Sequence, residues 1–75
     1  MLTPQQITDT YYLEARCMAL ELAALLDRYD AATARTGSPA PDTRKLEVLY
    51  ESFALLADKS QADRTESLLA IFTKI

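Results

Sequence analysis

The chain has 75 residues, 49% of them hydrophobic, with one cysteine, no histidine and a net charge of −3. This composition excludes an intramolecular disulfide and the usual histidine-containing zinc sites, and the excess of acidic residues argues against nucleic acid as a partner. No run approaches the ~20 apolar residues of a membrane span and the first residues do not resemble a signal peptide, so we expect a cytoplasmic protein that does not bind membranes.

The first predicted helix runs from residue 4 to about residue 35. Thr3 and Gln6 have the spacing of a capping box, and Pro4 suits the first position of a helix. No glycine or further proline follows until Gly37, the only glycine of the chain, which we expect to end the helix in the left-handed conformation. The two prolines of residues 36–41 then predict a loop.

Two shorter helices are predicted after this loop, over residues 42–57 and 61–74. Asp42 is the expected N-cap of the first, whose apolar stripe consists of Leu46, Leu49, Tyr50, Phe53, Leu56 and Ala57. Ser60 and Asp63 suggest a capping box for the second, whose expected inner face consists of Leu68, Leu69, Phe72 and Ile75. The pattern leaves open whether these helices are separate or form one bent helix.

The long first helix carries apolar residues on two faces. At about 100° per residue, a main apolar face is formed by Tyr11, Ala15, Met18, Leu22, Leu25, Leu26 and Tyr29. A second apolar face, about half a turn away, is formed by Leu13, Cys17, Leu20, Ala24 and Ala31. We expect Tyr11 and Tyr29 to lie in the interior, because tyrosines at helical spacing usually pack in a core or an interface.

One chain of this length has too few helices to cover both faces. Small folds without disulfides or a structural metal usually need oligomerisation, because burial and chain entropy nearly cancel. We therefore expect an all-α fold with residues 1–75 in a single domain. Its long N-terminal helix and two shorter helices form an antiparallel hairpin, and two chains pair into a dimeric bundle of four to six helices.

The second apolar face is the expected dimer interface, together with a row of charged residues at seven-residue spacing beside it. If two first helices cross antiparallel near Glu21, Glu14 of one chain faces Arg28 of the other. The alternative is that all three charged residues are solvated, since exposed ion pairs contribute only ~0–1 kcal/mol. The expected interface residues are Leu13, Cys17, Leu20, Ala24, Glu14, Glu21 and Arg28.

Metal binding and catalysis find little support in the sequence. Glu14, Cys17 and Glu21 share one side of the first helix, but carboxylate metal sites in helical bundles rely on Glu-x-x-His pairs. The lack of histidine also removes the usual base for a nucleophile, and no glycine-rich segment could bind a phosphate. We expect no enzyme activity, no catalytic residue, no metal site and no cofactor, and we interpret Cys17 as a packed small hydrophobe.

Four residues are candidates for a partner-binding patch. Arg44 and Lys45 lie in the first turn of the second predicted helix, where the helix dipole disfavours cations, and Arg35 ends the first helix across the loop. Tyr12 lies on the flank of the main apolar face and is free to contact a partner. The competing interpretation is ordinary solvated charge, with Asp42 compensating the cations.

These patterns favour a non-catalytic protein–protein interaction module: a small homodimeric helical adaptor or regulatory subunit that binds itself and a second, unknown protein. The alternative is a helical protein that binds a small molecule or an anion at the hairpin tip or in a tyrosine-lined groove. A closed, apolar, ligand-sized cavity would favour the alternative, whereas an exposed groove without a cavity would favour the interaction module.

Overall fold

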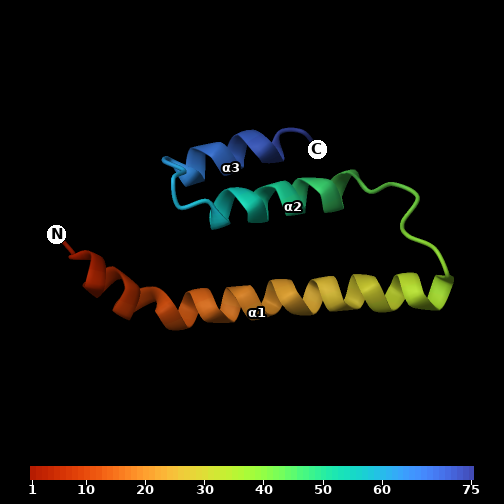
Figure 1. Cartoon of the computed structure of the whole chain (residues 1–75), viewed down its shortest axis with the longest axis horizontal. Coiled ribbons are helices and arrows are strands. Elements are labelled where there is room, and N and C mark those ends of the chain that lie inside the picture. Colours follow the sequence, from red (N-terminus) through yellow and green to blue (C-terminus); the bar gives the residue numbers. More distant parts are fainter. The chain divides into compact units, whose positions relative to one another are not determined.

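The computed structural model describes all 75 residues and is all-helical, with three helices and no strand (Figure 1). Helix α1 spans Pro4–Thr36, α2 spans Arg44–Ala57 and α3 spans Arg64–Phe72. The chain divides into two compact units, Met1–Ser38 with α1 and Pro39–Ile75 with α2 and α3.

Helix α1 has the ends that the sequence predicts. Thr3 Oγ1 accepts a hydrogen bond from the backbone N–H of Gln6 at 3.2 Å, and Gln6 Oε1 accepts one from the N–H of Thr3 at 2.8 Å, so the capping box is confirmed. At the other end Gly37 has a φ of 76°, and its N–H donates to the carbonyl of Thr33 at 2.8 Å. Only glycine adopts this left-handed conformation without steric cost, which is why the helix ends here, one residue later than predicted.

No residue of α1 is buried. Large apolar side chains are exposed on both of its apolar faces. Tyr11 is 50% accessible, so this residue, which is expected in a core or an interface, has no interior position within the single chain. Leu26 and Tyr29 are half-buried. The exposed residues include Tyr11, Tyr12, Leu13, Met18, Leu20, Leu22 and Leu25.

Helices α2 and α3 pack against each other as an antiparallel pair (Figure 1). The buried residues are Val48 and Ser52 of α2 and Ile71 of α3. Ser52 is only 3% exposed, and its Oγ donates to the carbonyl of Val48 at 2.8 Å, so no hydroxyl is left unsatisfied in the contact. At the open end of the pair, Lys74 Nζ lies 2.7 Å from Glu51 Oε1 and ties the C-terminal residues to α2.

The packing face of α2 differs from the one predicted. Of the predicted stripe, Leu46, Leu49 and Phe53 are half-buried and Tyr50, Leu56 and Ala57 are exposed. The buried residues of α2, Val48 and Ser52, lie roughly a third of a turn from the centre of this stripe. Ser52 is polar, so a hydrophobicity pattern does not mark this buried position as core. The ring of Tyr50 instead contacts its own helix, edge-on to Phe53 with centroids 5.7 Å apart.

The inner face predicted for α3 is also largely wrong. Leu69 and Phe72 are exposed, as is Ile75 beyond the helix, and Leu68 is half-buried. The residue that enters the core is Ile71, next to Leu68 and roughly a quarter of a turn from the centre of the predicted face. With only one neighbour in this unit, α3 buries a single narrow stripe, and the remaining apolar residues stay accessible.

The turn at residues 58–63 separates α2 from α3. The predicted Ser60–Asp63 capping box is wrong, because Ser60 bonds to Asp58 instead: its N–H and its hydroxyl both donate to Asp58 Oδ1, at 2.9 and 2.6 Å. The hydroxyl bond first and the N–H bond second lower the pKa of the Asp58 carboxyl. Asp63 adopts a left-handed φ of 50° before α3 begins at Arg64, three residues later than predicted, and Arg64 Nη2 donates to the Asp58 carbonyl at 3.0 Å.

Candidate functional site

The main apolar face of α1 is exposed from Tyr11 to Leu25 and is hollowed near its centre. A depression of about 490 Å³, open to solvent, is lined by three apolar and two charged residues of the helix: Met18, Leu22, Leu25, Glu21 and Arg28. The apolar residues belong to the main face, and the charged ones belong to the row beside it. The surface therefore combines an apolar floor with charges of both signs on one flank.

The predicted dimer-interface residues are all exposed in the chain. Leu13 and Leu20 are 64% and 56% accessible, and Ala24 is exposed as well. The thiol of Cys17 is exposed, so the packed position expected for this side chain is not met within the chain. The role of these residues in an interface remains a prediction.

The charged row Glu14, Glu21 and Arg28 is solvent-exposed, and none of the three forms an ion pair within the chain. The seven-residue spacing places them nearly in line along α1. Their charges form a row parallel to the helix axis and are available to a partner.

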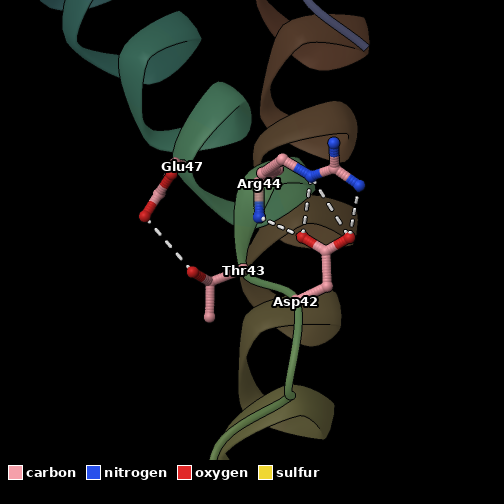
Figure 2. A network of polar contacts seen from close by, with 4 residues as sticks. All are labelled: Asp42, Thr43, Arg44 and Glu47. Atoms are coloured by element: carbon pink, nitrogen blue, oxygen red, sulfur yellow. Dashed lines mark hydrogen bonds and ion pairs between the residues drawn. The ribbon is translucent and has the colours of Figure 1, made fainter.

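The residues at the start of α2 form a local network of polar contacts (Figure 2). The helix begins at Arg44, two residues later than predicted, with Thr43 at the N-cap position. Asp42 still supplies the capping contact, because its Oδ1 accepts from the N–H of Arg44 at 3.0 Å, while its Oδ2 accepts from Arg44 Nη2 at 2.8 Å. Glu47, one turn into the helix, accepts a hydrogen bond from the hydroxyl of Thr43 at 3.2 Å.

This network compensates the cation that the sequence places against the helix dipole. The guanidinium of Arg44 and then its backbone N–H hold the pKa of the Asp42 carboxyl below its ordinary value, and the same pairing raises the pKa of Arg44. Asp42 is therefore ionised at neutral pH and occupies the anion-binding side of Arg44. The ion pair with Asp42 therefore accounts for a cation in the first turn of α2, where the helix dipole disfavours one, without a binding site for a partner.

The partner-binding patch predicted from the sequence is only partly assembled. Arg44 and Lys45 line one small depression of about 180 Å³ together with Asp42, Lys74 and Ile75. Arg35 and Tyr12 belong to the other compact unit, so the structure does not unite them with this depression. Lys74 was missed because only the antiparallel pairing of α2 and α3 brings it here.

The cations of this depression are largely neutralised. Arg44 is paired with Asp42, and Lys74 is paired with Glu51, which leaves Lys45 as the cation without an ion pair. The pairs are exposed, so they favour the interpretation of solvated surface charge over that of an anion site.

A second depression between α2 and α3 is apolar and open. It has a volume of about 270 Å³ and is lined by Lys45, Val48, Leu49, Phe72 and Ile75. Pockets that bury small molecules are usually larger, roughly 300–1,000 Å³, and enclose most of the ligand. The depressions on α1 and between α2 and α3 are therefore open grooves rather than closed ligand cavities.

No three side chains of the types that hold metal ions are grouped together. None of the three helices combines the length and the apolar character needed to cross a bilayer.

Comparison with family models, curated proteins and solved structures finds no match for this chain.

Proposed function

We propose that the protein is a non-catalytic protein–protein interaction module, a small homodimeric helical adaptor or regulatory subunit in which α1 is the interaction helix. The observation that carries this proposal is that a helix of 33 residues contains no buried residue, although its faces hold seven large, exposed apolar side chains between Tyr11 and Leu25.

Two physical arguments support self-association. Most helices in proteins owe their stability to packing of an apolar face rather than to intrinsic propensity. Soluble monomers also rarely expose contiguous apolar surface along a whole element, and where they do the surface is usually an interaction site. A second copy of the chain is a partner that is always present, and two-fold pairing of a self-complementary helix face covers both copies at once.

The alternative function, binding of a small molecule or an anion, has weaker support. The hairpin tip offers one unpaired cation, Lys45, and the neighbouring apolar depression is open and small. The depression on α1 is lined by charges of both signs and contains no tyrosine. These features suit a protein surface better than a ligand pocket.

Sedimentation equilibrium of the full chain at 1–100 µM tests the proposal. We expect a mass twice that of the 8.4 kDa chain, with dissociation on dilution accompanied by a loss of helicity from α1. A single species of chain mass across this concentration range, with full helicity, would contradict self-association.

A further inference from the structure

We propose that α1 pairs with α1 of a second copy in antiparallel orientation through its main apolar face, with Glu14 opposite Arg35 of the partner subunit and Glu21 opposite Arg28 of the partner subunit. This inference rests on the proposed self-association and specifies its face, its direction and its register.

The main apolar face has the spacing of a coiled-coil seam. Its residues alternate in steps of four and three, which is the spacing of the two core positions of a heptad repeat. The open depression lies at the middle of this seam, between Met18, Leu22 and Leu25, where a side chain of a partner helix would insert. The seam consists of six of the seven residues of the main apolar face, and the seventh, Leu26, lies on its flank: Tyr11, Ala15, Met18, Leu22, Leu25 and Tyr29.

The two flanks of the seam differ in charge. One flank carries the charged row and its continuation to Arg35, so that acidic residues occupy its N-terminal half and basic residues its C-terminal half: Glu14, Glu21, Arg28 and Arg35. All four are exposed, and none is in an ion pair within the chain. The other flank is uncharged and consists of Tyr12, Ala19, Leu26 and Thr33.

This asymmetry selects the antiparallel orientation. In a parallel pair of helices, each flank faces the opposite flank of the partner, so the charged row would meet only uncharged residues. In an antiparallel pair each flank faces the same flank of the partner, and the acidic half of one row meets the basic half of the other. Charges that flank the seam of paired helices set partner choice and orientation in this way.

The charges also select the register. With Glu21 opposite the partner's Arg28, Glu14 faces the partner's Arg35, and by two-fold symmetry four pairs of opposite charge form. The same alignment places Leu22 against Leu25 and Met18 against Tyr29 in the seam. The register expected from the sequence, with Glu14 opposite Arg28, instead sets Glu21 against its own symmetry mate, a like-charge contact.

The second apolar face is less suited than the main apolar face to the pairing of two α1 helices. Continued at the same spacing from Leu20 and Ala24, it reaches Asp27, whose carboxylate would be desolvated by a partner helix. Its other members are mostly small, so they offer less apolar area than the leucines, methionine and tyrosines of the main face. We therefore assign the self-association to the main apolar face rather than to Leu13, Cys17, Leu20 and Ala24.

Two charge-exchange variants with the same net charge test this arrangement. E14R/R35E reverses both members of one proposed pair, so all four contacts keep opposite signs, and we expect its Kd to stay within about 3-fold of the unmodified chain. E14R/R28E creates Arg–Arg and Glu–Glu contacts at all four positions, and we expect its Kd to rise on the order of 100-fold. Sedimentation equilibrium gives both constants, and circular dichroism checks that each variant remains helical.

The outcomes separate this inference from the proposed function. If the unmodified chain dimerises and the two variants have equal affinities, the antiparallel register is wrong while self-association stands. If E14R/R28E is the variant that dimerises normally, the register with Glu14 opposite Arg28 holds instead. If the unmodified chain is monomeric, the proposed function itself fails.

Discussion

The substitution L22D is expected to abolish self-association. Leu22 lies at the middle of the main apolar face, lines the depression on α1 and is 37% exposed in the single chain. Two-fold pairing would bury this position twice in each dimer. Loss of one core leucine costs about 2–5 kcal/mol, and burial of a carboxylate adds to this, so we expect the Kd to rise by at least about 1000-fold.

The matched control is L20D on the opposite face of the same helix. Leu20 is 56% exposed and belongs to the second apolar face. The substitution therefore introduces the same carboxylate at nearly the same position along the helix axis. We expect the affinity of L20D to stay within about 5-fold of that of the unmodified chain, because an exposed substitution changes little. If L20D dissociates the dimer and L22D does not, the second apolar face is the interface.

The substitution I71A is expected to destabilise the packing of α3 against α2. Ile71 is 7% exposed and is the only buried residue of α3, so we expect the packing of α3 against α2 to depend on it. Truncation of a buried isoleucine to alanine costs about 2–5 kcal/mol, a large share of the stability available to a unit this small. Amide hydrogen exchange should show protection in α3 falling by at least about 30-fold.

The control for this prediction is L69A in the same helix. Leu69 is 62% exposed, so removal of its side chain takes little apolar surface out of a packed environment. We expect a change in the free energy of unfolding of less than about 0.5 kcal/mol. Equal losses of protection in I71A and L69A would mean that α3 is held by a contact other than the Ile71 core.

The ends of α1 could be predicted because the signals are local. The Thr3–Gln6 capping box and Gly37 each act on backbone groups within four residues, and the structure has both contacts. The all-helical class follows from the same kind of information, since the residues between Pro4 and Thr36 include no helix breaker.

The packing of α2 and α3 could not be predicted, because it depends on contacts distant in the sequence. The core residue Ser52 is polar, and its burial is permitted by a hydrogen bond to Val48 that only the helix geometry reveals. Ile71 competes with neighbouring apolar residues of equal hydrophobicity, and the position of α2 decides which of them is buried. The Lys74–Glu51 ion pair joins residues 23 positions apart and has no local signal.

The candidate interaction surface was partly predictable. The periodicity of α1 identifies both apolar faces and the charged row, since all of these follow from the repeat of one helix. Which face meets a partner is not a property of periodicity alone. The choice depends on the continuation of the charged row to Arg35 and on Asp27 in the second face, which become decisive only when the two possible pairings are compared.

The distance between two copies of a spin label tests the central claim most directly. The variant D9C/C17A carries one label per chain at an exposed position near the N-terminal end of α1. The antiparallel pair centred between Leu22 and Leu25 places the two labelled residues about 40 Å apart, at 1.5 Å per residue. A separation of roughly 20 Å or less, as adjacent parallel helices would give, or the absence of any coupling between labels at dimer-forming concentrations, would contradict the account.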